Sequence, residues 1–247
     1  MIPDQPVWNM ACKMYFSDTY NNRSIVPFTL RRRWEFVETG SAAAILKAFC
    51  PDEWKDIVHV LDTFQLDPKT WMRAGGNRGK VPAIIDQLFS ERGWVETRID
   101  VHHQGHLYGA NKRLVQTLDP LVMEGYLVDN FKGRVVVDVE WNAKDGNLDR
   151  DLAAYRAWHE AGIISAAVLI TQDRISLRDL ARRLWQDYQE TLPADARTAK
   201  LPIDVGTSTT TNLEKAQMRL RRGVMGTCPV LVVAVTEATW NGAPFEG

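Results

Sequence analysis

Residues 128–151, VDNFKGRVVVDVEWNAKDGNLDRD, place acidic side chains in a stretch that otherwise has the pattern of a buried strand. The odd-numbered valines of the run 135–139 fall on one side of a period-2 pattern, and Asp138 and Glu140 fall on the other. Asp129 lies just upstream, before a short Lys-Gly turn. Because alternate residues lie about 6.7 Å apart along a strand, this arrangement can bring three oxygen ligands to one point.

These acids have two interpretations. Alternating acids usually form the solvent-exposed face of a strand. The valine run instead indicates a strand that is buried on much of both faces, where carboxylates without a partner are costly. Neighbouring carboxylates also repel one another, and a bound cation relieves both problems. The pattern therefore favours a divalent-metal site over an exposed strand face.

Composition limits the class of protein. The chain has 247 residues, of which 45% are apolar, enough to bury a sizeable core as one domain. A formal net charge of −1 excludes a uniformly basic coat for nucleic acid. The cysteines, Cys12, Cys50 and Cys228, are isolated and predict neither a disulfide framework nor a zinc site. The N-terminal residues lack a signal-peptide pattern, and no apolar run approaches the roughly 18 residues of a membrane span, so we expect a cytoplasmic protein.

Apolar periodicity predicts an α/β fold. The expected elements, in chain order, are helical residues 31–66, a core helix at 82–94, an alternating strand at 94–106, the acidic strand, a helix at 148–162, a buried strand at 163–172, a helix at 176–192 and a buried strand at 228–235. The acidic strand, the helix after it and the next strand form a crossover unit of a mixed sheet. The acidic strand is therefore expected in the interior of that sheet.

A polar segment at 204–212 precedes a basic helical pattern. Hydroxyl and amide side chains hydrogen-bond phosphates or base edges, and Arg and Lys neutralise the DNA backbone. Thr and Ser are also ordinary helix caps, but their combination with basic residues favours nucleic acid. The candidate DNA-binding residues in this region are Thr209, Thr210, Asn212, Lys215, Arg219 and Arg222.

Three further residues are weaker candidates. Glu91, near the end of the helix at 82–94, could add a carboxylate to the metal centre, although an exposed surface acid is the commoner role. The run HHQGH at 102–106 does not match a standard zinc-ligand spacing. Contact with phosphate is therefore favoured over metal binding for His103 and His106.

One extended pattern is similar to that of a known enzyme family. It comprises Asp129, eight further residues, the run 138–142, then Lys144-Asp145 and the run 149–152. This pattern resembles the BglII/BstYI family of type II restriction endonucleases and, more distantly, BamHI. The similarity extends from about residue 77 to residue 235 and includes the segments GTSTTTN and CPVLV. The resemblance implies a PD-(D/E)XK restriction endonuclease-like core, with a central mixed β-sheet flanked by helices and an N-terminal helical layer.

The resemblance also implies roles for individual residues. Asp129 matches the first metal-binding acid, and Asp138 matches the second, which is usually Glu. Glu140 occupies the position that is Lys in most PD-(D/E)XK enzymes, Gln in BglII-like members and Glu in BamHI. It would orient the attacking water or accept its proton. The implied catalytic residues are Asp129, Asp138 and Glu140, and the implied metal ligands are Asp129, Asp138 and the backbone carbonyl of Val139.

A second register of the motif ranks behind this one. It uses Asp129, Glu140 and Asn142, with ten residues between the two acids. Asn142 and Lys144 also match a segment that faces DNA in BglII-like enzymes, so both join the candidate DNA-binding residues.

The activity that the resemblance implies is hydrolysis of DNA phosphodiester bonds, with one or two Mg²⁺ ions per active site, at a short palindromic site with a central GATC. Cutting both strands of a palindrome implies a homodimer on double-stranded DNA. We expect a single endonuclease domain over 1–247, with the N-terminal helical layer at 1–76 and the catalytic and DNA-binding core at 77–247. No membrane partner is expected. The alternatives are a PD-(D/E)XK repair or recombination nuclease, a catalytically silent DNA-binding protein and a metal-binding structural domain.

Overall fold

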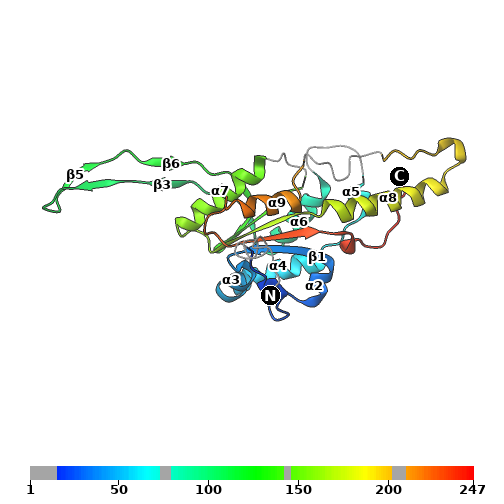
Figure 1. Cartoon of the computed structure of the whole chain (residues 1–247), viewed down its shortest axis with the longest axis horizontal. Coiled ribbons are helices and arrows are strands. Elements are labelled where there is room, and N and C mark those ends of the chain that lie inside the picture. Colours follow the sequence, from blue (N-terminus) through cyan, green and yellow to red (C-terminus); the bar gives the residue numbers. More distant parts are fainter. Residues whose placement is uncertain (1–15, 73–78, 142–145, 202–209) are drawn as a thin grey trace, which may run out of the picture.

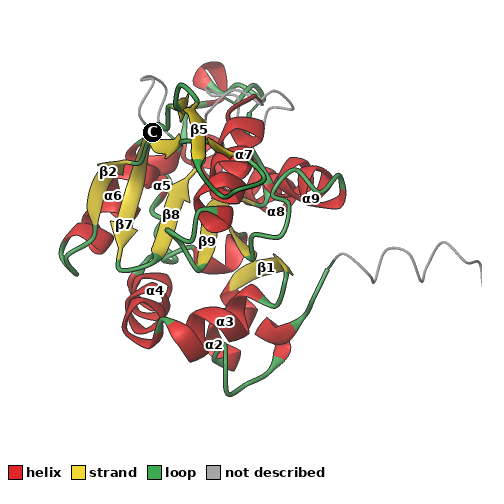
Figure 2. Ribbon diagram, turned by 90° about the vertical axis from the view of Figure 1, so that its left-hand side faces the viewer, coloured by secondary structure: helices red, strands yellow, loops and turns green. Residues whose placement is uncertain are grey.

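The computed structural model describes residues 16–72, 79–141, 146–201 and 210–247. Within these ranges the main feature is a six-stranded mixed sheet with the strand order β1-β10-β9-β8-β7-β2. Its strands are β1 (Trp34–Thr39), β2 (Val95–Arg98), β7 (Leu127–Lys132), β8 (Val135–Val139), β9 (Ala166–Gln172) and β10 (Val230–Val235). Figure 2 shows β2, β7, β8 and β9 side by side, with β1 at the opposite side of the sheet from β2.

The acidic strand β8 lies in the interior of this sheet, as the sequence predicts. It pairs in parallel with β9 and antiparallel with β7, where Asn130 lies opposite Val137. A tight turn joins β7 to β8, and in it Gly133 has a φ of 54°, in the left-handed region that glycine enters without a steric penalty. Helix α7 (Gly146–Glu160) lies between β8 and β9 in the chain, so the predicted crossover unit is confirmed.

Helices cover both faces of the sheet (Figure 1). The other helices are α2 (Phe28–Arg33), α3 (Ala42–Phe49), α4 (Pro51–Thr63), α5 (Pro68–Trp71), α6 (Lys80–Ser90), α8 (Arg174–Thr191) and α9 (Leu213–Arg221), with 3-10 turns η1 (Thr19–Asn21), η2 (Ala194–Ala196) and η3 (Glu237–Thr239). The odd-numbered valines of β8 join one core with α3, α4, α6 and α8, and Val136 joins a second core with α7 and α9. The predicted two-sided burial of β8 is confirmed. Within the described residues no helix is both long and apolar enough to cross a bilayer.

The expectation that residues 31–66 are helical is wrong for one segment. Trp34–Thr39 forms strand β1, which pairs antiparallel with β10 at the edge of the central sheet. Its sequence, WEFVET, is rich in aromatic and β-branched residues, which favour strands. The N-terminal region therefore contributes an edge strand as well as the helices α2, α3 and α4.

The predicted strand at 94–106 is divided. Val95–Arg98 stays in the sheet as β2, whereas β3 (Val101–His103) and β4 (His106–Tyr108) leave it. They pair antiparallel with β6 (Leu121–Met123) and β5 (Leu114–Thr117). Together these strands form a two-stranded ribbon that projects from the core (Figure 1). We call residues 101–123 the arm.

A buried ion cluster ties α4 to the sheet. The Asp56 side chain, 8% exposed, accepts hydrogen bonds from Lys132 Nζ at 2.8 Å, from Trp94 Nε1 at 3.2 Å and from Arg92 Nε. Burial opposes the charged form of Asp56, but these donors prevail and hold its pKa below the ordinary value of 3.8. The cluster joins α4, the end of α6 and β7, and so fixes the strand that carries Asp129.

Asp56→Asn is expected to lower the free energy of unfolding by about 2–3 kcal/mol at neutral pH, because it leaves the Lys132 and Arg92 cations without their shared anion. The depressed pKa stabilises the fold above pH 3.8, and this contribution is lost as the pH falls through the lowered folded value. The difference from wild type should therefore shrink in acid. Urea unfolding at several pH values measures it. Asp62→Asn, at an exposed position of α4, is the control and should change stability by less than about 0.5 kcal/mol; an equal loss in both variants would contradict the role of Asp56.

Candidate active site

Two acids on neighbouring strands each accept a hydrogen bond from a backbone N–H of the opposite strand. Because β7 and β8 are antiparallel, Asp129 lies beside Asp138. The Asp129 carboxylate accepts a hydrogen bond from Val139 N at 2.8 Å, and the Asp138 carboxylate accepts one from Asp129 N at 3.0 Å. These two bonds fix Asp129, on β7, beside the C-terminal end of β8.

The Asp138 carboxylate is fully occupied by donors. Its Oδ2 atom accepts hydrogen bonds from the hydroxyls of Tyr126 and Tyr155, both at 2.6 Å, while Oδ1 takes the bond from Asp129 N. The residue is 2% exposed. Burial raises the pKa of Asp138, and the three hydrogen bonds oppose that rise. The Arg150 guanidinium lies 4.2 Å from the centre of the Tyr126 ring and covers the cluster.

Glu140 and Asp151 form a second acidic pair at the end of β8. Glu140 N donates to Ile170 O at 2.8 Å, which carries the strand pairing one residue past β8. Both side chains are buried, and Glu140 Oε2 and Asp151 Oδ2 receive no hydrogen bond. Burial, then the neighbouring Asp151 carboxylate, raise the pKa of Glu140. Arg150 Nη2 lies 2.7 Å from Asp151 Oδ1 and 4.0 Å from Glu140 Oε1. Its positive charge therefore offsets the charge of Asp151 more than that of Glu140.

A cavity of about 1080 Å³ opens between the end of β8 and α6. Asp129 and Glu140 line it, together with Asp86, Asn130 and Val139. Sequence analysis missed Asp86, whose carboxylate accepts a hydrogen bond from Asn130 Nδ2 at 2.9 Å. The sequence feature that could have identified Asp86 is its place directly after Ile85, a buried position of the predicted core helix. Asp138 lies behind this lining, against α7.

In the described residues Asp129 and Asp86 form no ion pair, and Glu140 has only the 4.0 Å contact with Arg150. Burial, followed by the charge of Asp138, raises the pKa of Asp129 to about 7. Burial also raises the pKa of Asp86, against the hydrogen bond from Asn130. Carboxylate oxygens, one of them buried without a donor, fit a hard divalent cation. As the side chains stand, no group of three His, Cys, Asp or Glu in the described part of the chain is arranged to hold a metal ion.

The candidate DNA-binding residues divide into three groups. Asn142, Lys144 and Thr209 lie outside the described residues. Arg222 is exposed, and Lys215 and Thr210 are partly exposed. For these residues DNA contact stays a prediction.

Two of the candidates have internal roles. The Asn212 side chain, 2% exposed, caps α9 by accepting a hydrogen bond from Lys215 N at 3.1 Å. Arg219, 7% exposed, binds the Asp149 carboxylate through two N–H···O contacts of 3.0 Å and joins α9 to α7. These contacts give Asn212 and Arg219 structural roles that the sequence pattern did not reveal.

The weaker candidates lie away from the buried acids. Glu91 is on the rim of the cavity, exposed, and accepts a hydrogen bond from Gln87 at 2.9 Å. His103 and His106 are exposed side chains of the arm, and His106 Nδ1 lies 3.1 Å from Thr117 Oγ1. None of the three belongs to the cluster of Asp129, Glu140 and Asp151.

Burial and the neighbouring Asp151 raise the pKa of Glu140 to about 9, so folding at pH 8 must protonate a carboxylate that is ionised in the unfolded chain, which costs stability. Glu140→Gln removes this cost and is expected to stabilise the protein in chelator at pH 8. A gain on the order of 1 kcal/mol raises Tm by roughly 2–4 °C in a chain of this size. Thermal unfolding measures the shift. Glu91→Gln, the same exchange on the exposed rim, is the control and should leave Tm unchanged. A lower Tm for Glu140→Gln would show that this carboxylate stabilises the fold.

A family model described as restriction endonuclease BglII/BglIII matches residues 34–235, which include β1, the arm, the cavity acids and β10. No individual curated protein matches the chain.

Proposed function

Because the chain belongs to the BglII/BglIII restriction endonuclease family, and is thus a site-specific deoxyribonuclease, we propose that the cavity at the end of β8 is its active site. The observation that carries this proposal is the pair of acids that line the cavity, Asp129 and Glu140, with one buried oxygen that has no donor. The reaction would be hydrolysis of phosphodiester bonds in double-stranded DNA, with Mg²⁺ as the cofactor.

In this proposal the residues of the cavity bind the metal ion, orient the attacking water and accept its proton. Asp129 and Glu140 would hold one or two Mg²⁺ ions, and Val139 N keeps the Asp129 carboxylate in place. Val139 and Asp86 line the same cavity, so the carbonyl of Val139 and the carboxylate of Asp86 are further candidate ligands. When bound, a divalent ion lowers the pKa of a water and stabilises negative charge on phosphate. In the first register of the motif, Glu140 would orient the attacking water or accept its proton, since no lysine occupies its position.

Both registers of the motif include Asp129, and they differ in the role of Asp138. In the first register Asp138 is a metal ligand. In the second, Glu140 takes that place and Asp138 positions Asp129 through its backbone N–H. The second register is supported by the three hydrogen bonds that occupy Asp138 and by its place behind the cavity lining. We propose the second register, with Tyr126 and Tyr155 as the groups that hold Asp138.

The substrate would be a short palindrome, with GATC as the proposed central sequence. Each active site would cut one strand, so the working unit would be a homodimer. Asn142, Lys144, Thr209, Thr210, Lys215 and Arg222 remain the proposed contacts to DNA, and the protein would act in the cytoplasm as part of a restriction-modification system.

Digestion of unmethylated phage DNA with purified protein and Mg²⁺ tests the proposed function. Discrete, reproducible fragments are expected. Nicks confined to branched or damaged DNA would favour a repair nuclease, and a mobility shift without any cutting would favour a silent DNA-binding protein. Either result would overturn the proposal.

Asp129→Asn is expected to reduce the cleavage rate by roughly a thousandfold or more, because both registers use this carboxylate. DNA affinity measured in chelator should be retained or should increase, since one negative charge near phosphate is lost. Glu96→Gln is the matched control, because Glu96 lines the same cavity but is exposed. Its cleavage rate should stay near that of wild type. Normal cleavage by Asp129→Asn would refute the assigned site.

A further inference from the structure

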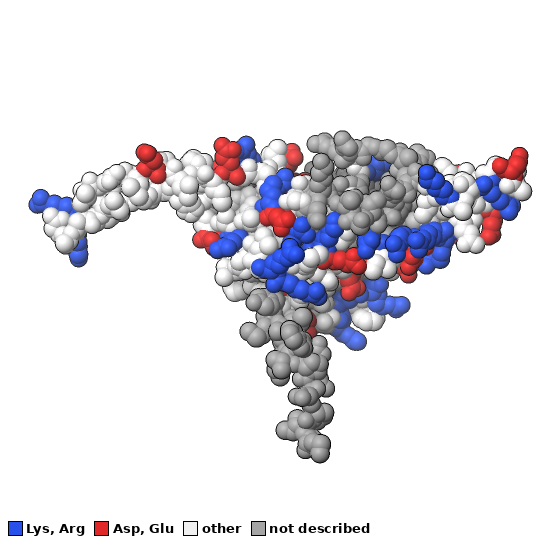
Figure 3. Space-filling view, turned by 45° about the horizontal axis from the view of Figure 1, so that its top comes forward, with Lys and Arg blue, Asp and Glu red and all other residues white. Residues whose placement is uncertain are grey.

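Three arginines surround one exposed aromatic ring in the N-terminal layer. Their Cζ atoms lie 5.3 Å (Arg23), 5.6 Å (Arg31) and 5.9 Å (Arg32) from the centre of the Phe28 ring, which is 50% exposed. We call these four residues the arginine cluster. In Figure 3 cationic side chains gather at the lower edge of the core. A guanidinium attracted to a ring still has N–H donors for an anion.

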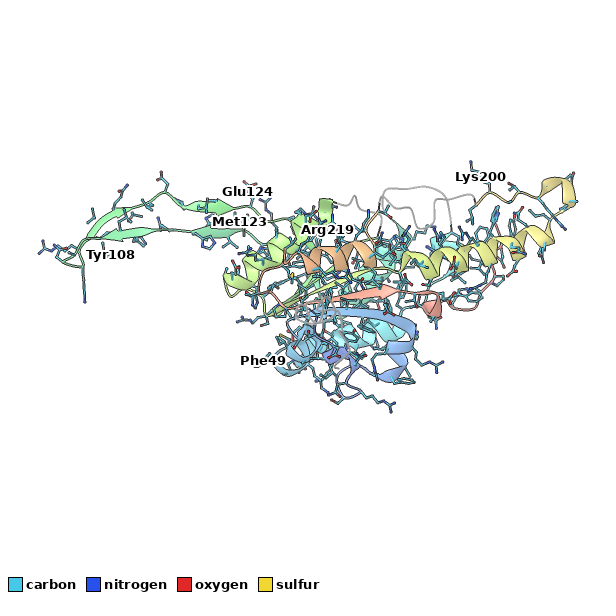
Figure 4. The ribbon with its side chains drawn as sticks, in the orientation of Figure 1. Phe49, Tyr108, Met123, Glu124, Lys200 and Arg219 are labelled. Atoms are coloured by element: carbon cyan, nitrogen blue, oxygen red, sulfur yellow. The ribbon has the colours of Figure 1, made fainter. Side chains whose placement is uncertain are left out.

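Exposure of an aromatic ring does not by itself produce such a cluster. Phe49 lies in the same layer, on α3 (Figure 4), and is 77% exposed. In the described residues no cation lies over its ring. The three arginines around Phe28 are therefore a specific feature of α2 and the turn before it.

The positive charge of the arginine cluster has no acidic partner in the part of the chain that the structure describes. None of its three arginines forms an ion pair there, whereas the adjacent Arg33 lies 3.9 Å from Asp62. The buried Nε atom of Arg31 also donates no hydrogen bond. Residues 19–33 contain four arginines and neither Asp nor Glu, a formal charge of +4. Like charges held this close repel one another, and a bound anion relieves the repulsion.

Helix α2 presents the arginine cluster from a fixed position. Leu30 is 1% exposed and packs in the same core as α4. Arg33 donates hydrogen bonds to the backbone carbonyls of Asp62, at 2.8 Å, and Phe64. Because these contacts anchor one side of the short helix, a ligand on the other side meets side chains whose backbone is already in place. Binding there costs less conformational entropy than binding to a loose segment.

The arginine cluster lies at the sheet edge that carries the cavity. β8, β9 and β10 are parallel, and their C-terminal ends form this edge, where Glu140 N donates to Ile170 O. β1 is antiparallel to β10, so it begins here, with Trp34 paired to Val235 and α2 directly before it. From β8 to β1 there are three strand spacings, about 14 Å, the length of roughly four base pairs of duplex. A duplex that continues several base pairs past the cavity is thus long enough to reach the cluster.

The family assignment gives the arginine cluster no role, because the matched range begins at residue 34. Its chemistry is that of a phosphate site. The planar guanidinium pairs its N–H groups with the oxygens of a phosphate, and the charge of duplex DNA recurs about every 1.7 Å along the axis. Carboxylates of an acidic protein are the other anions that fit. DNA is favoured because it is the polyanion on which this family acts.

We propose that the arginine cluster binds the sugar–phosphate backbone of double-stranded DNA outside the sequence that is cut. The proposal rests on the proposed function, in which the cavity hydrolyses DNA. The contact reads no bases, because every phosphate is alike, and it adds the same affinity to any flanking sequence. It holds the duplex along the sheet edge while the target sequence occupies the cavity.

Fluorescence anisotropy in chelator tests this contact with two duplexes that contain the cut sequence. One has about 40 base pairs and the other about 10, so that the shorter one ends before the cluster. For Arg23→Gln, Arg31→Gln and Arg32→Gln combined, Kd for the long duplex should rise roughly tenfold or more. The slope of log K against log salt should become shallower by about 2 to 3, since each phosphate contact contributes about 0.9. A long duplex without the cut sequence should show the same loss.

Lys55→Gln, Arg134→Gln and Arg156→Gln combined form the charge-matched control. These exposed side chains lie on α4, on the turn between β7 and β8 and on α7, so the variant loses the same charge without touching the cluster. It should change Kd for either duplex by less than about threefold. The cluster variant should bind the short duplex as this control does. Circular dichroism and thermal unfolding establish that both are folded; if the cluster variant is not, the exposed Arg23→Gln and Arg32→Gln are measured singly, each with a smaller rise expected.

Three results would overturn the contact. Wild-type affinity of the cluster variant for the long duplex would exclude DNA and leave an acidic protein as the partner of the cluster. An equal loss on the long and short duplexes would show that the arginines do not contact flanking DNA. An equal loss in the control would show a general effect of net charge.

Cleavage separates this contact from the proposed function. A wild type that cuts no DNA, with the cluster variant still weaker on long duplexes, would overturn the proposed function and leave the contact standing. A wild type that cuts DNA, with the cluster variant unchanged in binding, would overturn the contact alone.

Discussion

The structure of the site depends on one electrostatic constraint, which is that several carboxylates are buried together with too little positive charge. Asp129, Asp138, Glu140 and Asp151 all have raised pKa values, with burial as the largest cause in each. Arg150 is the cation that contacts this group in the described residues, and it lies closest to Asp151. A fold that maximised stability would not keep such a cluster, so its retention favours a functional role.

The fold meets this constraint in two ways. Asp138 receives two tyrosine hydroxyls and a backbone N–H, so its charge is solvated by the protein itself. Asp129 and Glu140 are left facing the cavity, where Glu140 keeps an oxygen with no donor. The fold therefore divides these acids into one that is held by donors and two that offer carboxylate oxygens to the cavity, the ligand type that a hard divalent cation takes. In our account the antiparallel pairing of β7 with β8 creates this division, since that pairing sets Asp129 beside Asp138.

The sequence predicted the centre of the fold because local patterns determine it. The valines of β8, the helix that ends before Gly162 and the apolar run of β9 each have a clear period, and their order defines the crossover unit. The strand β1 was missed because WEFVET follows three arginines at the end of a helix and precedes an alanine-rich helix. Its strand conformation depends on pairing with β10, almost two hundred residues later in the chain. The arm was missed because alternation predicts a strand but not where that strand leaves the sheet.

The site was predictable in its acids but not in their environment. The spacing of Asp129, Asp138 and Glu140 indicates oxygen ligands, yet only tertiary contacts show that Tyr126 and Tyr155 occupy Asp138 and that Asp86 reaches the cavity from α6. The central claim is that Asp129 and Glu140 share a cation while Asp138 stays bound to its tyrosines. Anomalous diffraction from crystals grown with Mn²⁺ tests it most directly. Our account predicts a Mn²⁺ peak between the Asp129 and Glu140 carboxylates with both tyrosine contacts to Asp138 intact; a peak bound by Asp138 with those contacts broken, or no peak among the acids, would contradict it.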